Sequence, residues 1–329
     1  MKRVATPSKY WLACGLALGL ALSGYAPVAA AAKPVRDAVP PPPPTPRVVQ
    51  PAPPAPAPKL PAMTAEQIVE RNVAARGGLK AWRAVNTLSY AGQLDAGGKK
   101  PSMLPFTLLV KRPNKQRFAL DFAGKTSLQV YDGEHGFTYR PYLGRTEPEP
   151  FSPEEQQRHG AGQPDLEGWL IDYAAKGSRI ALDGTETVEG KGDYKLKLTT
   201  RDGVEHHLWI DATTFLETKV EDSPRRIDGK MRRTDTYLRD YRTVDGLVIP
   251  FVSETRVDGV RAAHSMTVEK VTVNPPIDDA VFTKASMIAA ANAPAAAVAG
   301  AAPGAGTAAG ANPSAAKPAA AAQPATPHK

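Results

Sequence analysis

The chain has one cysteine in 329 residues, and this residue, Cys14, lies within an apolar N-terminal run. If that run is a leader that is removed on export, the mature protein contains no thiol. Disulfide bonds and thiolate chemistry are then both excluded, and a packed apolar core must supply the stability. The apolar run itself, residues 11–22, is about a dozen residues long. It falls short of the roughly 20 residues that a membrane-spanning helix needs.

Recognisable catalytic motifs are also missing. The sequence contains no Gly-x-Ser-x-Gly elbow, no phosphate-binding loop and no His-Glu-x-x-His. His206 and His207 are adjacent, so on a strand their side chains point to opposite faces and cannot easily share a metal ion. His135 and His159 stand alone on expected loops. We therefore predict no catalytic residue, no metal site and no cofactor; a hydrolase whose site has no recognisable motif is the alternative.

The first 32 residues have the three parts of a secretory signal peptide. Lys2, Arg3 and Lys9 form a basic start, residues 11–22 form the apolar centre, and residues 29–32 are alanines that suit cleavage. We expect a boundary at residue 32 and a periplasmic mature protein. The alternative is a leader that stays uncleaved and tethers the protein to the membrane.

Two low-complexity arms flank the predicted folded domain. Residues 33–62 are rich in proline and alanine, including consecutive prolines at 40–44, and favour an extended polyproline II linker. Residues 286–329 are mostly alanine, proline and glycine. We expect them to form a disordered tail, because they offer almost no large side chain to bury. Residues 63–285 lie between the arms and are predicted to be one domain.

The formal net charge of +8 comes from the leader and the two arms, so residues 63–285 carry no net charge. A neutral domain argues against a nucleic-acid partner, because phosphate binding requires a basic surface. One stretch is locally basic. Its cations alternate with acidic residues, which favours a solvated hairpin of mixed charge over a site for an anionic headgroup or an acidic partner. The residues are Arg225, Arg226, Lys230, Arg232, Arg233 and Arg239, interleaved with Asp222, Asp228, Asp235 and Asp240.

Short strand patterns separated by turn residues dominate residues 63–285. Thr64 and Gln67 form a capping box and Gly77-Gly78 supply a left-handed stop, which predicts a helix that is followed by a helical turn over 79–85. Ser152-Pro153 predicts another helix start, and residues 165–176 place large apolar side chains on one helical face. The predicted strands are 87–94, 104–111, 116–122, 126–131, 136–139, 194–200, 205–210, 215–221, 230–241, 247–257 and 261–273.

These strands alternate large apolar residues with polar or small ones, which gives one buried face and one wet face. Connections of hairpin length make neighbouring strands antiparallel. A sheet of about 10–11 such strands with few helices is best satisfied by curling around those helices, which also limits exposed edges. The predicted fold class is mainly β (α+β): an unclosed, strongly curved antiparallel β-barrel with a few helices covering its apolar concave face. We expect a monomer.

Several motifs follow one another in a specific order along the domain. They are Ala65-Glu66-Gln67-Ile68-Val69-Glu70 with Gly77-Gly78-Leu79-Lys80-Ala81-Trp82, then Tyr194-Lys195-Leu196-Lys197-Leu198 with Asp202-Gly203, Leu208-Trp209-Ile210-Asp211 with Thr213-Thr214-Phe215-Leu216, residues 241–251, and Ile277-Asp278-Asp279-Ala280-Val281-Phe282. Together they resemble the LolA/LolB-like superfamily of periplasmic outer-membrane lipoprotein-sorting proteins. The resemblance implies a half-open barrel in which helices form a lid over a hydrophobic cavity that holds acyl chains, and a role in outer-membrane biogenesis. The two arms and an insertion at 152–176 depart from the dedicated carriers of that superfamily.

The predicted function is that of a periplasmic carrier for lipid or lipoprotein acyl chains. Its predicted partners are lipid or acylated protein, with inner- or outer-membrane proteins as donors or acceptors. The alternative is a non-enzymatic sensor or interaction module of the same fold that binds a membrane-protein partner. The predicted cavity wall is Phe106, Leu108, Val110, Phe118, Leu120, Phe122, Leu196 and Leu198, with Trp169, Leu170 and Tyr173 in the lid. A filled core made of the same side chains is the competing interpretation.

Overall fold

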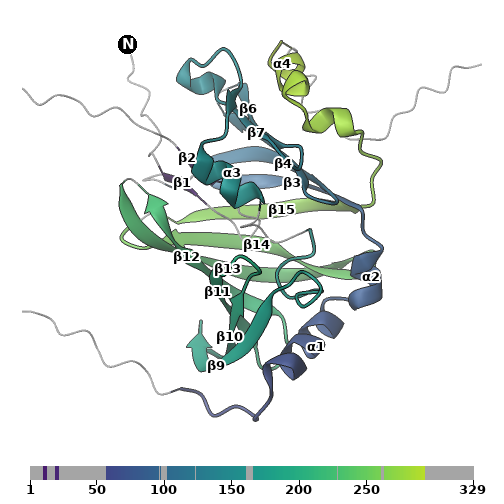
Figure 1. Cartoon of the computed structure of the whole chain (residues 1–329), viewed down its shortest axis with the longest axis vertical. Coiled ribbons are helices and arrows are strands. Elements are labelled where there is room, and N and C mark those ends of the chain that lie inside the picture. The colour runs from purple at the N-terminus through teal and green to yellow at the C-terminus, as the bar shows by residue number, and fades with distance from the viewer. Residues whose placement is uncertain are drawn as a thin grey trace, which may run out of the picture.

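A computed structural model describes residues 10–12, 19–21, 57–95, 97, 102–122, 124–160, 166–227, 229–260 and 263–292. One antiparallel sheet of 13 strands forms the body of the protein (Figure 1). Its strands are β3 (Thr87–Asp95), β4 (Met103–Lys111), β5 (Lys115–Phe122), β6 (Lys125–Tyr131), β7 (Gly136–Tyr139), β8 (Glu149–Pro150), β9 (Arg179–Val188), β10 (Lys191–Thr199), β11 (Glu205–Asp211), β12 (Glu217–Ile227), β13 (Lys230–Val244), β14 (Leu247–Val257) and β15 (His264–Val273).

The sheet consists of two meanders that are joined by a single strand pair. Strands β3 to β8 run in sequence order from the middle of the sheet to one edge, and β9 to β15 run from the other edge back to the middle. There β3 pairs with β15, which places Leu88 opposite Val273. Among the described strands, the edge strands β8 and β9 do not pair with each other, so the sheet is not closed. The predicted fold class, mainly β with an unclosed antiparallel sheet, is confirmed.

Helices α1 (Ala65–Ala75) and α2 (Leu79–Arg83) follow the capping signals of the sequence. The Thr64 hydroxyl accepts a hydrogen bond from the Gln67 N–H at 3.3 Å, and the Gln67 side chain accepts one from the Thr64 N–H at 2.9 Å. Gly77 has a φ of +104°, and a Cβ at this position would lie 2.2 Å from the carbonyl oxygen of Gly246. Glycine therefore allows the end of α1 to approach the turn between β13 and β14.

Both helices lie against one face of the sheet, which we call the inner face. Ile68 of α1 packs in an apolar cluster with Leu196 and Leu208. Trp82 of α2 packs in a second cluster with Leu88 and Leu108. These clusters cover the inner face of the strands that flank the β3–β15 pair, so the buried face that the alternation predicted is the face that carries the helices.

Residues 166–177 form a succession of turns, and the helix predicted over 165–176 is wrong for the described part of that range. Gly168 has a φ of +94° and Asp172 a φ of +56°, and left-handed residues at two places interrupt a right-handed helix. We call residues 166–177 the covering segment, because its Leu170 and Ile171 are buried in the two inner-face clusters. The helix predicted to start at Ser152-Pro153 is confirmed as α3 (Pro153–Gly160).

Two strands of the 13-stranded sheet, β8 and β9, were not predicted, and both lie at its edges. Most side chains of β9 are exposed, so this strand lacks the apolar alternation that reveals a half-buried strand in a sequence. Its pairing with β10 shifts register near Gly184, which has a φ of +104°. Such an irregularity helps an edge strand to avoid pairing with another chain.

We call the opposite face of the sheet the outer face. It is only partly exposed to solvent. The 3-10 turn η2 (Asp279–Phe282) and helix α4 (Lys284–Asn292) bring Phe282 and Met287 against Leu128 and Val130. This third apolar cluster corrects the prediction of a uniformly solvated second face, because Leu109 and Ala119 of the neighbouring strands also pack into it. The boundary expected at residue 285 falls inside α4. The remaining short helix, η1 (Pro141–Leu143), lies in the turn after β7.

The last residues of the Pro-rich arm contact the domain. The carbonyl of Pro58 accepts a hydrogen bond from the Thr185 hydroxyl at 3.0 Å, and that of Pro61 accepts one from the Tyr194 hydroxyl at 2.9 Å. Two short strands, β1 (Tyr10–Leu12) and β2 (Gly19–Ala21), pair with each other within the predicted signal peptide. The rest of that peptide, residues 33–56 and residues 293–329 lie outside the described residues. No helix within the described ranges is long and apolar enough to cross a membrane.

Candidate ligand pocket

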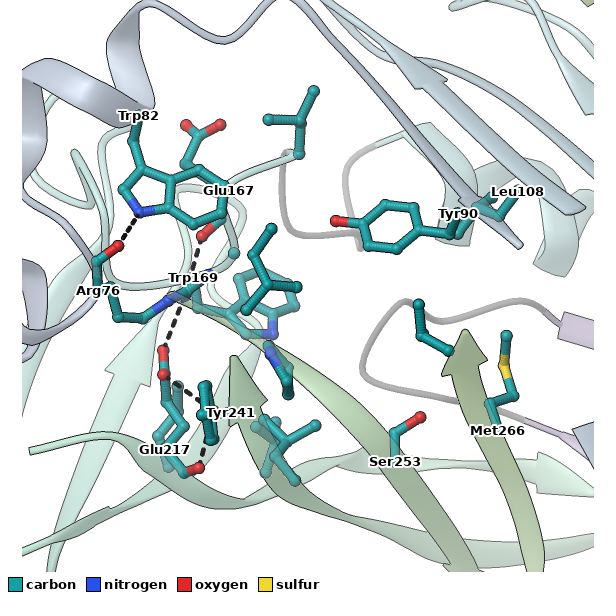
Figure 2. A pocket seen from close by; sticks show the side chains of 18 of the residues that line it. Arg76, Trp82, Tyr90, Leu108, Glu167, Trp169, Glu217, Tyr241, Ser253 and Met266 are labelled. Atoms are coloured by element: carbon teal, nitrogen blue, oxygen red, sulfur yellow. Dashed lines mark hydrogen bonds and ion pairs between the residues drawn. The ribbon is translucent and has the colours of Figure 1, made fainter. Parts of the chain in front are cut away.

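A mostly apolar pocket opens on the inner face, between the sheet and the covering segment (Figure 2). Its volume is about 100 Å³, and the hollow measures about 900 Å³ when its open mouth is included. Strands on both sides of the β3–β15 pair supply the wall, and α2 and the covering segment supply the roof. The apolar lining comprises Trp82, Tyr90, Phe106, Leu108, Leu166, Trp169, Leu208, Val220, Leu238, Ile249, Pro250, Met266 and Val268.

A buried ion pair lies at one end of the pocket. Arg76 Nη1 lies 3.2 Å from Glu217 Oε1, and the Arg76 guanidinium stacks on the ring of Trp82 at 4.7 Å from its centroid. The Tyr241 hydroxyl donates to the backbone carbonyl of Glu217 at 2.8 Å. The indole N–H of Trp82 donates to the Arg76 carbonyl at 2.8 Å. This network links the end of α1 to β12 and β13. Within it, the positive charge of Arg76 and the negative charge of Glu217 compensate each other.

Three ionisable groups of the pocket, Tyr90, Tyr241 and Arg76, keep their protons at neutral pH. Burial raises the pKa of Tyr90, and the charge of Arg76 only partly opposes this effect. Burial and the Glu217 carboxylate together raise the pKa of Tyr241 well above its ordinary value. Burial alone would lower the pKa of Arg76, but the Glu217 carboxylate outweighs it and the pKa is raised. Both phenols therefore stay neutral, and Arg76 stays cationic.

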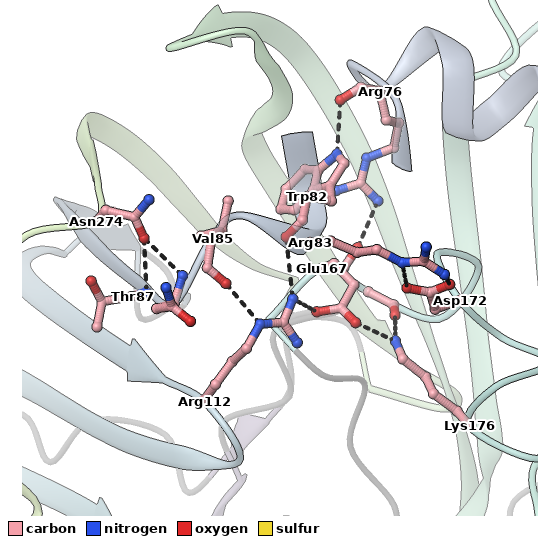
Figure 3. Close-up of polar contacts among 12 residues, drawn as sticks. Arg76, Trp82, Arg83, Val85, Thr87, Arg112, Glu167, Asp172, Lys176 and Asn274 are labelled. Carbon is pink, nitrogen blue, oxygen red and sulfur yellow. Dashed lines mark hydrogen bonds and ion pairs between the residues drawn. The ribbon is translucent and has the colours of Figure 1, made fainter. Parts of the chain in front are cut away.

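Ion pairs and hydrogen bonds fasten the covering segment to the body of the domain (Figure 3). The carboxylate of Glu167 is 3% exposed and lies 2.8 Å from both Arg112 Nη2 and Lys176 Nζ. Arg76 Nη1 donates to the backbone carbonyl of Glu167 at 3.1 Å. On the surface, Asp172 accepts two hydrogen bonds from Arg83 of α2, at 2.6 and 2.8 Å. Side-chain contacts from the end of α1, from α2 and from the β4–β5 turn thus hold the covering segment in place.

Near the start of the covering segment, Trp169 packs against a histidine. Trp169 stacks on His206 with ring centroids 4.1 Å apart, and His206 lies 3.5 Å from Asp222. His207, the next residue, lies on the outer face and contacts Glu221 at 3.1 Å. The two histidines point to opposite faces, as the sequence predicts. Trp169 therefore closes the pocket by an aromatic contact.

Three of the predicted cavity residues line the pocket: Phe106, Leu108 and Trp169. The others are absent from its lining. Val110, Phe118 and Leu120 are buried in the cluster around Trp82, and Phe122 packs at its margin. Leu170, Leu196 and Leu198 are buried in the cluster around Ile68, with Tyr173 packed at its margin. Six of these residues are thus buried in the two inner-face clusters, and Phe122 and Tyr173 are partly buried against them.

Sequence reasoning missed the second wall of the pocket. Strands β12 to β15 supply Val220, Leu238, Ile249 and Met266, and these strands meet β3 and β4 only through the non-sequential β3–β15 pair. Arg76 and Glu217 were missed for the same reason, since they are 141 residues apart in the sequence. One signal was available: an arginine directly before Gly77-Gly78 places a cation at the end of α1, where it faces the sheet.

Comparisons with known proteins give a family and several similar structures. A family model described as "-like: Uncharacterized protein" matches residues 122–289, which is just over half of the chain. The structure is similar to a LolA superfamily protein from Nitrosomonas europaea, with 16% identity, a TM-score of 0.46 and coverage of 68% of this chain and 100% of that one. A putative outer-membrane lipoprotein-sorting protein domain from Vibrio parahaemolyticus has 14% identity, a TM-score of 0.45 and coverage of 68% and 97%.

A DUF1329 family protein from Desulfovibrio piger is also similar, with 12% identity, a TM-score of 0.46 and coverage of 67% and 98%. The search of curated proteins gives no match. The LolA superfamily that the motifs resemble is thus among the proteins whose structures are similar to this one.

Proposed function

We propose that this chain, which belongs to the family whose model matches residues 122–289, is a periplasmic carrier. It binds the acyl chains of a lipid or a lipoprotein in the inner-face pocket. The observation that carries the proposal is the pocket itself. It is walled by apolar side chains from both meanders, and its roof is a segment that belongs to neither a helix nor the sheet. The predicted signal peptide supports the periplasmic location.

The energetics favour a hydrocarbon ligand. Each methylene that leaves water contributes about 0.8 kcal/mol, so a long acyl chain gains on the order of 10 kcal/mol in a dry pocket. The carrier needs no reacting group for this purpose. The ion pair of Arg76 and Glu217 is internally neutral and hydrogen-bonded, which suits a role in holding the pocket together. We therefore propose binding and transfer, and not catalysis, as the activity.

Uptake of a long chain requires the covering segment to move. Pockets that hold ligands the size of common small molecules measure about 300–1,000 Å³, and the enclosed volume of about 100 Å³ is smaller. The volume of the hollow falls within that range, at about 900 Å³, only when its open mouth is included. Displacement of Leu166 and Trp169, which line the pocket from the covering segment, would enlarge it. In this proposal the structure represents the closed, ligand-free state of the carrier.

Native mass spectrometry with lipid extraction tests the proposal on the full chain, purified from the periplasm without detergent. We expect co-purifying acyl species. Ser253 lines the pocket, whereas its neighbour Val252 faces the opposite side of β14. Ser253→Phe should therefore abolish lipid capture by filling the pocket, and the matched control Val252→Phe should retain it.

The proposal is wrong if the purified protein is lipid-free and takes up no added lipid or lipopeptide. A protein of this kind that captures a membrane-protein partner would instead be the non-enzymatic interaction module. Equal lipid capture by Ser253→Phe and by the wild type would also contradict binding in this pocket.

A further inference from the structure

Tyr90 is the residue of β3 that lines the pocket, and its strand joins the two meanders of the sheet. Its Cα pairs with that of Leu108 on β4 and with that of Val271 on β15. The residue is buried, with 4% of its surface exposed. Figure 2 shows the ring extending from β3 into the pocket, with the hydroxyl at the end that points toward Trp169 and Arg76. The phenol therefore places a polar atom among the apolar side chains of the lining.

The Tyr90 hydroxyl makes no hydrogen bond to any part of the chain that the structure describes. Other polar groups of the lining have acceptors within the protein. The Tyr241 hydroxyl donates to the backbone carbonyl of Glu217 at 2.8 Å, and the indole N–H of Trp82 donates to the Arg76 carbonyl at 2.8 Å. A buried hydroxyl without an acceptor costs free energy, which a phenylalanine in the same place would avoid. Tyr90 is thus suited to a partner that enters the pocket.

The chemistry of that partner follows from the state of the phenol. Burial raises the pKa of Tyr90, and the charge of Arg76 only partly opposes this effect. The phenol therefore keeps its proton at neutral pH and offers an O–H donor. The group that satisfies it is a hydrogen-bond acceptor on the ligand.

The charges of the pocket indicate that this acceptor is neutral. Each charged side chain in the described lining lies in an ion pair: Arg76 lies 3.2 Å from Glu217, and Glu167 lies 2.8 Å from both Arg112 and Lys176. An ionised ligand group would lose its hydration in the pocket without gaining a counter-ion of its own. An uncharged carbonyl oxygen avoids this cost and still accepts a hydrogen bond.

We propose that the Tyr90 hydroxyl donates a hydrogen bond to the carbonyl oxygen of an acyl ester or acyl amide, so that the pocket takes the linkage of the ligand as well as its hydrocarbon. The inference rests on the proposed carrier function and specifies the ligand class. That class is a neutral acyl ester or amide, in preference to a free fatty acid. The carbonyl lies beside Tyr90, and the acyl chain contacts apolar side chains of both meanders, such as Leu108 and Met266.

The test compares two ligands that differ by one carbonyl group, 1-monoolein and its ether analogue 1-O-oleylglycerol. The full chain is titrated with each, and the fluorescence of Trp82 and Trp169, which line the pocket, reports binding. We expect monoolein to bind roughly five-fold more tightly, as one neutral hydrogen bond implies. Tyr90→Phe removes the donor and keeps the ring, so it should bind the two ligands equally. Oleate at pH 8 should bind less tightly than monoolein, because its carboxylate is ionised.

Tyr241→Phe is the matched control, since it removes the same atom from the same pocket but from a hydroxyl that already has an acceptor. It should keep the ratio between the two affinities, whatever its effect on each. Denaturation of the ligand-free protein supplies a second readout. Tyr90→Phe should not lower the free energy of unfolding, whereas Tyr241→Phe should lower it, because only Tyr241 donates a hydrogen bond within the described protein.

Other outcomes overturn the proposal in distinguishable ways. If the wild type binds monoolein and the ether analogue equally, or if Tyr90→Phe keeps the preference, the carbonyl site is wrong and the carrier function stands. If oleate binds more tightly than monoolein at pH 8, the neutral ligand class is wrong. If Tyr90→Phe destabilises the ligand-free protein as much as Tyr241→Phe does, the Tyr90 hydroxyl serves the fold and not the ligand. If none of the three ligands binds, the carrier function and this inference fail together.

Discussion

Arg76, at the end of α1, forms an ion pair with Glu217 of β12, with Nη1 and Oε1 3.2 Å apart and side chains that are only 9% and 5% exposed. The same guanidinium nitrogen donates to the backbone carbonyl of Glu167 in the covering segment. Arg76 therefore contacts both β12, at one end of the pocket, and the covering segment, which belongs to its roof. The stability of the domain and the closure of the pocket are coupled through this residue.

Replacing Arg76 by methionine should destabilise the domain strongly, because Glu217 would remain buried without a counter-ion. Breaking such a pair by removing one partner costs about 3–5 kcal/mol. Chemical denaturation measures the free energy of unfolding. The double variant Arg76→Met with Glu217→Met should recover most of the loss, since no buried charge is left. A single variant that loses less than about 1 kcal/mol would contradict this account.

Replacing Trp169 by alanine should accelerate ligand release, because the stack on His206 that closes the pocket is lost. An aromatic contact of this kind contributes about 1 kcal/mol, so the release rate should rise roughly five-fold. Stopped-flow displacement of a fluorescent fatty acid measures it. Tyr173→Ala lies in the same covering segment but outside the pocket lining, and it should change the rate little. Equal acceleration by both variants would show that general loosening, and not the stack, controls release.

Asp193 should make the domain less stable as the pH rises through the acidic range. Its side chain is fully buried, and burial raises its pKa to about 6, although the Thr218 hydroxyl donates a hydrogen bond to it. The same carboxyl titrates near pH 4 in an unfolded chain. Between these values the folded state binds more protons, so stability is full below about pH 4 and falls by up to about 3 kcal/mol by pH 6 to 7. Asp193→Asn should flatten this part of the curve and raise stability at pH 7.5.

The neighbouring Asp211 provides the control of opposite sign. Burial alone would raise its pKa, but the backbone N–H groups of Thr214 and Thr213 lower it. A lowered pKa adds stability above the unfolded value that is lost as the pH falls. Asp211→Asn should therefore destabilise the domain at neutral pH in thermal melts. If both asparagine variants shift stability in the same direction, the assignment of the two carboxylates is wrong.

Replacing Met287 by alanine should destabilise the domain even though the sequence places this residue in the predicted tail. Its side chain is fully buried against Leu128 and Val130 on the outer face, and such a truncation costs about 2–5 kcal/mol. Ile288 is next to it in α4 and 44% exposed, so Ile288→Ala should cost no more than about 0.5 kcal/mol. Denaturant melts of the two variants check this contrast; equal effects would contradict the docking of α4.

Local signals in the sequence predicted much of the architecture. The capping box at Thr64 and the Gly77-Gly78 stop depend on neighbours within a few residues, and both are present as predicted. Strands with one apolar face, such as β4 with Leu108, were found by their alternation. Strand β9 was missed because an exposed edge strand needs no alternation. The helix predicted over the covering segment failed because Gly168 and Asp172 adopt left-handed conformations, which tertiary contacts to Arg76 and Arg83 maintain.

The sequence by itself determined an antiparallel, mainly β domain with one apolar face, since alternation and turn residues act over short distances. Only the tertiary structure decided which apolar residues line a pocket and which fill a core. Phe118 and Leu120 look like Phe106 and Leu108 in the sequence, yet only the latter pair faces the hollow. The difference arises because β3 pairs with β15 and brings Leu238 and Met266 opposite them. The pocket is formed by segments that are far apart in the sequence, so no local sequence pattern predicts it.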